Sequence, residues 1–391
     1  MKDQQASYPQ LRFKGFTDPW EERKLGDLGS VAMNKRIFKE QTSDVGDIPF
    51  YKIGTFGGTP DAFISRDIFE EYKSKYQYPE VGDILISASG SIGRTVVYQG
   101  YDEYFQDSNI VWLKHDQQLD NSFLKQFYSI VKWQGLEGST IKRLYNKNIL
   151  ETKITLPSPE EQAQLGSFFK QLDDTIALHQ RKLAKLKELK QGYLQKMFPQ
   201  NASKFPQLRF AGFADAWEQR KLGEEAQLTM GQSPNSENYT KNPDDYILVQ
   251  GNADMKNGRV VPRVWTTQIT KKAEKSDLIL SVRAPVGDIG KTDYDVVLGR
   301  GVAAIKGNEF IFQQLGKMKL TGYWTRYSTG STFESINSND IKDAKIMVPV
   351  EEEQQKIGAF FKQLDDTIVL HQRKLEKLQE LKKGYLQKMF C

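Results

Sequence analysis

The chain of 391 residues is long enough for two to four domains, at roughly 100–200 residues per domain. With 55 Lys and Arg against 50 Asp and Glu, its net charge of +5 is compatible with nucleic-acid binding but does not identify it. The single cysteine, Cys391, excludes an intramolecular disulfide and a cysteine-cluster metal site, and no run reaches the ~18 apolar residues of a membrane helix, so we expect a cytoplasmic protein without a secretory signal.

The first recognisable segment is one that recurs later in the chain. Residues 9–26 contain PQLRF and RKLG, and both motifs return within residues 206–223. Trp20 and Trp217 occupy the same place in the two copies. This recurrence indicates an internal duplication.

Residues 1–157 are expected to form a first domain of mixed α and β structure. Short β-branched or aromatic runs bounded by Gly, Pro, Asp or Asn predict its strands. The predicted strands are Asp83–Ser87, Thr95–Tyr98, Ile110–Leu113 and Ile154–Leu156, and a helix is expected at Ser122–Gln134.

Residues 158–199 are predicted to form one long helix. Ser158 suits the N-cap, Pro159 the first helical position, and Glu161 lies three residues after the cap. Apolar or semi-apolar residues then recur at spacings of three and four, the heptad pattern of a coiled coil. The predicted seam consists of Leu165, Phe169, Leu172, Ile176, His179, Leu183, Leu186 and Tyr193. Further apolar residues widen this stripe, so a second face docks a partner or packs on the globular domains; the sequence leaves both open.

Residues 200–349 are expected to form a second mixed domain. Its predicted strands are Ile247–Gln250, Leu278–Val282 and Lys345–Val348, with a helix at Phe310–Tyr323. Three faint matches to the first domain remain: Gly82–Ser87 with Ser276–Ser281, Ser91–Thr95 with Asp288–Thr292, and Gly138–Thr140 with Gly330–Thr332. We therefore expect one fold presenting two different recognition surfaces, with neutral drift as the alternative.

Residues 350–391 repeat the long helix. Residues 160–198 align without gaps to 352–390 with 31 identities in 39 positions. The second seam consists of Ile357, Phe361, Leu364, Ile368, His371, Leu375, Leu378 and Tyr385. Because acidic residues come early and basic residues late in both helices, antiparallel pairing is favoured. Full overlap would bring His179 opposite His371, as a polar residue that fixes register or, less favoured, a pH-sensitive or metal-binding joint.

No catalytic motif was found in the sequence. Gly290-Lys291-Thr292 resembles the end of a phosphate-binding loop, but Pro285 occupies the place of the required earlier glycine. No dinucleotide-binding glycine motif, HExxH zinc motif or adenine-methyltransferase motif occurs either. His115 has no evident nucleophile partner and is expected in a surface loop. We predict a chain that is not an enzyme by itself and holds no metal.

Basic and amide residues occur near glycine-bounded turns in both domains. Arg and Lys bind guanine edges or phosphates, and Asn can read adenine. The DNA-binding candidates are Asn34, Lys35, Arg36, Lys52, Arg94, Ser139, Lys142, Arg143 and Asn146 in the first domain, and Asn252, Lys256, Arg259, Arg283, Lys291, Arg300, Arg326 and Ser331 in the second.

The whole arrangement resembles the specificity subunit of type I restriction-modification systems. The resemblance is carried by LPSPEEQ at 156–162 and VPVEEEQ at 348–354, followed by FKQLDDTI at 169–176 and 361–368. It implies an α/β (α+β) fold: two globular mixed α/β target recognition domains, separated by a long antiparallel two-helix coiled coil with pseudo-two-fold repetition.

The resemblance also implies a function and partners. Each domain would read one half of an asymmetric, bipartite target in double-stranded DNA, and the helices would dock two copies of the modification (methyltransferase) subunit. A restriction/translocase subunit would join through them. The chain would bind no cofactor itself; S-adenosylmethionine, ATP and Mg would belong to the partners that methylate adenine N6 and cleave DNA. The alternative is a helical adaptor with two protein-binding modules that does not bind DNA.

The duplication makes one further prediction. Because residues 1–199 hold one copy of every repeated segment, this fragment should form a homodimer that recognises a palindromic version of the first half-site.

Overall fold

The computed structural model describes residues 8–134, 142–200, 203–327 and 335–390. The chain divides into two compact units, each containing one globular domain and parts of both long helices. The first unit comprises Met1–Leu178 and Leu375–Cys391, and the second comprises His179–Lys374. Among the described residues, no helix is long and apolar enough to cross a membrane.

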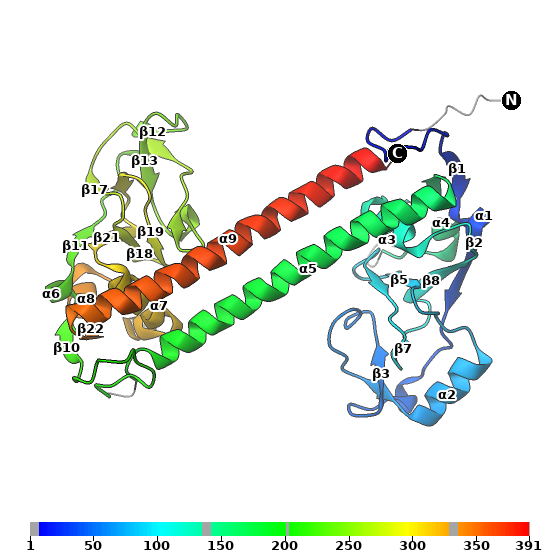
Figure 1. Ribbon diagram of the computed structural model, residues 1–391, viewed down its shortest axis with the longest axis horizontal. Helices are drawn as coiled ribbons and strands as arrows, with labels where there is room; N and C mark the ends of the chain where they lie inside the picture. Colours follow the sequence, from blue (N-terminus) through cyan, green and yellow to red (C-terminus); the bar gives the residue numbers. More distant parts are fainter. Residues whose placement is uncertain (1–7, 135–141, 201–202, 328–334, 391) are drawn as a thin grey trace. The chain divides into compact units, whose positions relative to one another are not determined.

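The first unit is built on a four-stranded antiparallel sheet of order β2-β8-β5-β6 (Figure 1). Its strands are β2 (Gly29–Met33), β8 (Ile110–His115), β5 (Ile84–Ser87) and β6 (Thr95–Val97). A second sheet consists of β4 (Phe63–Ile64), β3 (Ile48–Tyr51) and β7 (Tyr104–Phe105), and a ribbon pairs β1 (Glu21–Lys24) with β9 (Lys153–Leu156). The helices are α1 (Leu25–Leu28), α2 (Arg66–Lys75), α3 (Asn121–Ile130) and α4 (Asn146–Leu150), with a 3-10 turn, η1 (Lys39–Gln41).

The second unit repeats the same sheet order and extends it. Six strands follow as β11 (Gln227–Met230), β21 (Val302–Lys306), β18 (Leu278–Ser281), β19 (Ile289–Lys291), β15 (Arg259–Val260) and β14 (Met255–Lys256). A five-stranded sheet follows as β12 (Tyr239–Thr240), β16 (Trp265–Thr266), β13 (Tyr246–Val249), β20 (Val296–Leu298) and β17 (Lys271–Ala273), and β10 (Glu218–Lys221) pairs with β22 (Lys345–Val348). The helices are α6 (Leu222–Glu225), α7 (Glu309–Leu320) and α8 (Ser338–Lys342), with 3-10 turns η2 (Ser236–Asn238), η3 (Asn252–Asp254) and η4 (Tyr323–Tyr327).

The sheet register corrects one of the alignments expected from sequence. Ile86 pairs with Thr95 in the first unit, and Leu280 pairs with Ile289 in the second. Thr95 is therefore equivalent to Ile289, three residues before the Thr292 with which the sequence had matched it. Both segments contain Ile, Gly, a basic residue and Thr in the same order, and this similarity had concealed the shift of three residues. The matched Gly138–Thr140 and Gly330–Thr332 lie largely outside the described residues.

The predicted elements are present with shifted ends. The predicted strands match β5, β6, β8, β9, β13, β18 and β22 within one or two residues. The predicted helix Ser122–Gln134 ends earlier, at Ile130, and Phe310–Tyr323 divides into α7 and η4. His115 was expected in a surface loop; instead it ends strand β8, and its Nε2 lies 2.8 Å from Asn121 Oδ1. Backbone pairing with β2 continues beyond the apolar residues, because Lys114 pairs with Ser30 and His115 with Gly29.

The long helices are α5 (Pro159–Lys196) and α9 (Glu351–Met389). The Ser158 hydroxyl accepts a hydrogen bond of 3.3 Å from the Glu161 amide, which confirms the predicted N-cap. In the second unit Lys190 lies 2.6 Å from Asp365, and in the first unit Lys382 Nζ lies 2.5 Å from Asp173 Oδ1. Each contact joins the basic half of one helix to the acidic half of the other, so the predicted antiparallel pairing is confirmed.

In each unit an arginine of the repeated N-terminal segment binds a glutamate in the first turn of a long helix. We call these pairs, Arg12–Glu161 and Arg209–Glu353, the arginine clamps. Arg12 donates two hydrogen bonds, both 2.7 Å, to Glu161, whose side chain is 1% exposed. In the second unit Arg209 makes the same bidentate contact with the buried Glu353. These carboxylates therefore anchor the segment and do not close a capping box.

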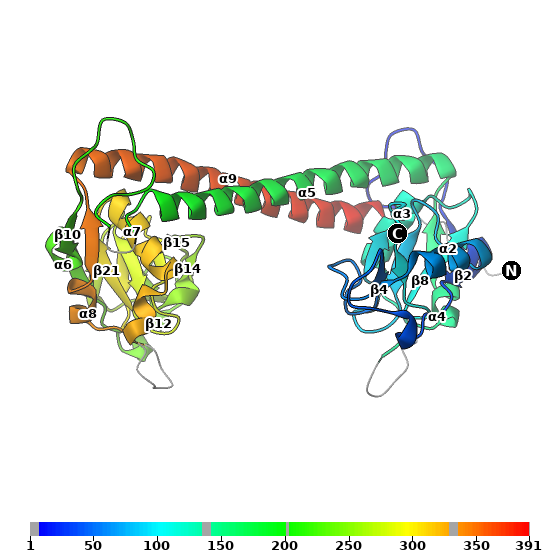
Figure 2. The same cartoon turned by 90° about the horizontal axis from the view of Figure 1, so that it is seen from below.

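Four aromatic rings join each globular domain to both long helices. In the first unit Phe123 of α3 stacks on Phe390 at 5.1 Å, and Trp20 and Phe169 complete the cluster. The second unit has the equivalent set Phe310, Phe198, Trp217 and Phe361. Figure 2 shows α3 and α7 against the long helices. The core of each domain thus includes the end of the helix that belongs to the other repeat.

Candidate nucleic-acid interface

One end of the first unit's main sheet gathers several of the basic candidates. Met33 pairs with Val111 and Ser87 with Ile110, so the last residues of β2 and β5 meet the start of β8. Residues 34–36 follow β2, residues 88–94 follow β5, and residues 106–109 precede β8. All three segments therefore lie at the same end of the sheet, which we call the sheet edge. Ile53 reaches this edge as well, because its amide donates to Gln106 Oε1 at 3.1 Å.

The turn that follows β5 is held in one conformation. Gly93 has φ +82°, and a Cβ at this position would lie 2.7 Å from Trp133 Nε1. The Ser87 hydroxyl donates to the carbonyl of Ser91 in the same turn. An L side chain at Gly93 would be both strained and obstructed, so the turn requires a glycine under this indole.

The candidates of the first domain differ in how they are held. Arg94 Nη2 donates to the Gly57 carbonyl at 3.3 Å, Arg143 Nη2 donates to the Ser108 carbonyl at 2.8 Å, and Lys52 pairs with Asp61 at 2.9 Å. Lys35 lies 5.0 Å from the Tyr76 ring and Arg36 lies 5.4 Å from the Phe38 ring. Lys142 and Asn146 are exposed, whereas Asn34 is 2% exposed and does not face solvent.

The second unit has the same edge with fewer basic residues. Ser281, at the end of β18, pairs with Val302, at the start of β21. Arg283 and Arg300 are both exposed there. Asn252 begins η3 close by, because the Gly299 amide donates to Val249, the last residue of β13, at 2.8 Å. This edge therefore presents different side chains on an equivalent frame.

The turn after β18 is held as the first one is. Gly287 has φ +87°, and a Cβ there would lie 2.4 Å from Trp324 Cδ1. Asp288 in this turn pairs with Lys319 of α7. Burial lowers the pKa of the Lys319 ammonium from its ordinary value. The two turns thus share a glycine under an indole.

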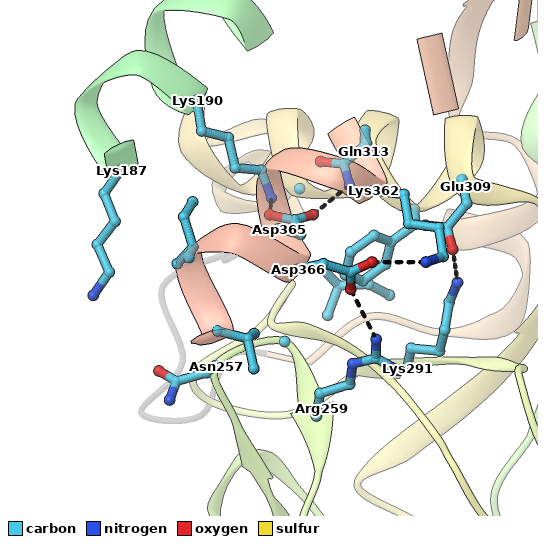
Figure 3. Close-up of a pocket in the computed structure, with 16 residues that line it drawn as sticks. Lys187, Lys190, Asn257, Arg259, Lys291, Glu309, Gln313, Lys362, Asp365 and Asp366 are labelled. Atoms are coloured by element: carbon cyan, nitrogen blue, oxygen red, sulfur yellow. Dashed lines mark hydrogen bonds and ion pairs between the residues drawn. The ribbon is translucent and has the colours of Figure 1, made fainter. Parts of the chain in front are cut away.

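Two of the candidates lie at the opposite end of the second sheet. Arg259 pairs with Lys291 across the strands, and Lys291 pairs with Leu278 at the start of β18. Arg259 binds Asp293 at 2.8 Å. It also lies 3.9 Å from Asp366 of α9, and Lys291 binds Glu309 of α7 (Figure 3). Carboxylates therefore neutralise both cations.

These two residues line a cavity of about 260 Å³ between the second sheet and the long helices of the same unit (Figure 3). Lys190 and Gln313 also line it, and both contact Asp365, at 2.6 and 2.8 Å. In the first unit Lys382 and Gln126 make the equivalent contacts with Asp173. Burial acts to raise the pKa of Asp173, but hydrogen bonds from Lys382 and Lys125 outweigh it, so the pKa lies below its ordinary value. This end of each domain is a junction with the helices.

Of the four remaining candidates, only Lys256 has a described side chain. Lys256 is exposed in β14. Ser139, Ser331 and the side chain of Arg326 lie outside the described residues.

Within the described ranges no group of three or more His, Cys, Asp or Glu side chains could hold a metal ion. None of these observations tests the DNA contacts, which stay predictions.

The predicted seam residues near the start of each long helix belong to the domain cores: Leu165 and Phe169 in the first unit, and Ile357 and Phe361 in the second. Leu165, Phe169, Leu183, Ile357, Phe361, His371 and Leu375 are buried, and Leu172, Ile176, His179, Leu186, Tyr193, Leu364, Ile368, Leu378 and Tyr385 are partly buried. Four leucines outside the seam, Leu178, Leu189, Leu370 and Leu381, are 41 to 56% exposed. The helices therefore retain an apolar outer face.

Reasoning from sequence missed the two tryptophans that cover the turns. Trp133 and Trp324 carry no charge and fall in no motif, so only the fold brings them to Gly93 and Gly287. A usable signal existed: each Trp follows its Gly-containing turn by about 40 residues in both domains. Ser108 and Tyr145, which contact Arg143, were likewise not predicted as part of the interface.

Solved structures with this fold are known. An S subunit of a type I restriction-modification system from M. genitalium has a TM-score of 0.69 with 17% identity, covering 98% of this chain and 99% of that one. A second structure, described under complex assembly and conformational transition of the type I R-M system, has a TM-score of 0.52 with 19% identity and covers 97% and 99% of the two chains. At these identities the similarity establishes the fold.

Proteins with similar sequences are also named as specificity subunits of type I restriction enzymes. A putative type I restriction enzyme specificity subunit from Haemophilus influenzae is 59% identical over 145 residues, which are 37% of this chain and 38% of that protein. The putative type I restriction enzyme MjaX specificity subunit from Methanocaldococcus jannaschii is 28% identical over 392 residues, covering 94% of this chain and 91% of that protein. This chain thus spans little more than a third of the first relative and nearly all of the second.

The family match covers most of the chain in two copies. The type I restriction modification DNA specificity domain matches residues 17–188 and again residues 214–380. Each match contains one sheet with its glycine turn and most of one long helix. The chain therefore belongs to the type I restriction-modification DNA specificity family, as the sequence motifs and the repeated fold both indicate.

Proposed function

We propose that this chain reads a bipartite, asymmetric DNA target, with one half-site contacted by each globular domain. One observation carries the proposal: the same sheet edge, with the same glycine turn, presents different side chains in the two units. A shared frame with divergent contact residues is what recognition of two different sequences requires.

The chemistry of these edges suits DNA. Lys35, Arg36 and Lys142 are exposed at the first edge, and Arg283 and Arg300 at the second. None of these five has a carboxylate partner among the described residues, whereas Arg259 and Lys291 do. Cations without a protein counter-charge can neutralise phosphates or donate to bases.

We further propose that the repeated helices dock two copies of a modification subunit, and through them a restriction/translocase subunit. The helices are nearly identical in sequence, and each leaves apolar side chains exposed: Leu178 and Leu189 on α5, and Leu370 and Leu381 on α9. A repeated surface is suited to two copies of one partner. S-adenosylmethionine, ATP and Mg would then bind to the partners, and this chain would bind no cofactor and catalyse no reaction by itself.

The test is selection from a random duplex pool by this chain together with the modification subunit. We expect enrichment of two short, different motifs at one fixed gap. The affinity for the selected duplex should fall steeply as salt rises, because phosphate contacts release counterions. A pool without enrichment would instead favour a protein-binding adaptor. Methyl transfer by the isolated chain with S-adenosylmethionine would contradict its non-catalytic role.

A further inference from the structure

We infer that Arg143 and Arg283 are the guanine-reading residues of the two half-sites, one in each domain. The inference rests on the proposed function and deepens it by naming the base and the side chain that binds it. It depends on a contact that occurs in both units with the arginine on opposite strands.

In each unit the chain leaving the central strand bonds to a segment that returns to it. In the first unit the Leu144 amide donates to the Ala88 carbonyl at 2.7 Å, and Ser89 forms an isolated bridge with Arg143. In the second unit the Ile336 amide donates to the Val282 carbonyl at 3.0 Å, and Arg283 forms the equivalent bridge with Ser335. Both bridges therefore pair one Arg with one Ser.

The arginine changes sides between the two bridges. Arg143 belongs to the returning segment, whereas Arg283 belongs to the turn that leaves the strand. Because the sheet registers equate Ser89 with Arg283, each bridge carries a single guanidinium at nearly the same place on the frame. The two domains thus keep the side chain while presenting it from different directions.

The backbone under each guanidinium is fixed. Gly93 and Gly287 both have positive φ beneath a Trp ring, so the turn beside each bridge has little freedom. A donor on a rigid turn loses less conformational entropy when it binds a base. Arg283 belongs to such a turn, and Arg143 is held against one by its bridge and by the Leu144–Ala88 hydrogen bond, so both guanidinium groups extend from a fixed backbone.

Both guanidinium groups have N–H donors that make no hydrogen bond within the described part of the protein. Arg143 gives one Nη2 hydrogen to the Ser108 carbonyl at 2.8 Å and lies 5.7 Å from the Tyr145 ring, so four of its five N–H donors remain. Arg283 is exposed and has no carboxylate partner among the described residues. Two N–H groups of one arginine match O6 and N7 of guanine in the major groove.

The experiment compares the motifs that the full chain selects, with its modification subunit, before and after Arg143→Lys and Arg283→Lys. Lysine keeps the positive charge but lacks the planar fork. We expect R143K to lose on the order of tenfold or more of the preference for one guanine in the first half-site, and R283K to do so in the second. The salt dependence should not change, because the charge is retained.

Arg23→Lys and Arg220→Lys provide matched controls. Both residues lie at equivalent places in the repeated segment, on strands β1 and β10, away from the sheet edges. Their variants should select the original motif. In each test variant the unaffected half-site also reports that the rest of the chain has folded.

The possible failures are distinguishable. If the unchanged protein selects two motifs but R143K and R283K select the same two, the inference is wrong and the proposed function stands. Loss of both half-sites from either variant would also contradict the assignment. If the unchanged protein selects nothing, the proposed function fails and this inference fails with it.

Discussion

The imidazole rings of His179 and His371 face one another in the second unit, with their Nδ1 atoms 3.0 Å apart. Sequence reasoning had predicted this pairing from the antiparallel overlap of the two helices. One Nδ1 must donate and the other accept, so the contact requires an unprotonated nitrogen on one ring. Burial, followed by the charges of Lys182, His179 and Lys374, lowers the pKa of His371 from its ordinary value.

This geometry predicts a loss of stability in mild acid. Since the folded protein favours neutral His371, the unfolded chain binds more protons, and stability falls as the pH drops below about 6.5. Above that pH the contribution is fully present. Urea unfolding between pH 7.5 and 5 should therefore show a steeper decline for the unchanged protein than for His371→Gln. Equal declines would mean that the pair has no role in the pH response.

The two arginine clamps on the buried glutamates should differ in strength. Arg209→Ala leaves Glu353 buried without its bidentate partner, and we expect a loss of about 3 kcal/mol in the free energy of unfolding. Arg12→Ala should cost about 1 kcal/mol less, because Trp20 Nε1 still donates to Glu161 at 3.2 Å.

Urea unfolding of both variants measures the difference between the clamps. The half-buried Arg23 and the exposed Arg220 pair with exposed carboxylates and provide the controls, and their alanine variants should stay within about 0.5 kcal/mol of the unchanged protein. Equal costs for R12A and R209A would show that the Trp20 contact contributes nothing.

The glycine turn of the second unit should not tolerate a methyl group. Gly287→Ala places a Cβ against the Trp324 ring at positive φ, so we expect a loss of about 1–3 kcal/mol and weaker recognition of the second half-site. Gly192→Ala is the control: it lies near the C-terminal end of α5, and nothing lies within 4 Å of its Cβ, so stability should rise by up to about 1 kcal/mol. A stable G287A protein with both half-sites intact would contradict the rigid turn.

The fragment 1–199 should associate as a homodimer. In the first unit Phe390 covers Trp20 and Phe123, and the fragment lacks this ring. Its own Phe198, the repeat equivalent of Phe390, can occupy that place only when supplied by a second copy. Analytical ultracentrifugation should therefore detect a dimer, and the dimer should bind a palindromic half-site. A folded, soluble monomer would count against the predicted exchange.

The sequence predicted the frame of this protein closely. The 31 identities between residues 160–198 and 352–390 revealed the duplication, and the opposite charges at the helix ends determined the antiparallel pairing. These features are local and periodic, so they can be read along one chain. The same reading also placed His179 opposite His371.

The contact surface could be predicted only as a set of residue types. Arg94, Arg143, Arg259, Arg283 and Lys291 looked alike in sequence, since each is a cation near a glycine-bounded turn. The sheet register separated them: Arg143 and Arg283 lie at the edges with the glycine turns, whereas carboxylates from α7, α9 and a neighbouring loop neutralise Arg259 and Lys291.

The sequence range of the interactions explains why the helical frame could be predicted and the environment of the cations could not. Helix periodicity and end charges act between residues a few positions apart, so the sequence by itself determined the repeat, the long helices and their pairing. The environment of a cation depends on groups that are distant in sequence, such as Ser108 beside Arg143 and Glu309 beside Lys291. Only the tertiary structure brings those groups together, and it alone decided which cations are available to a ligand.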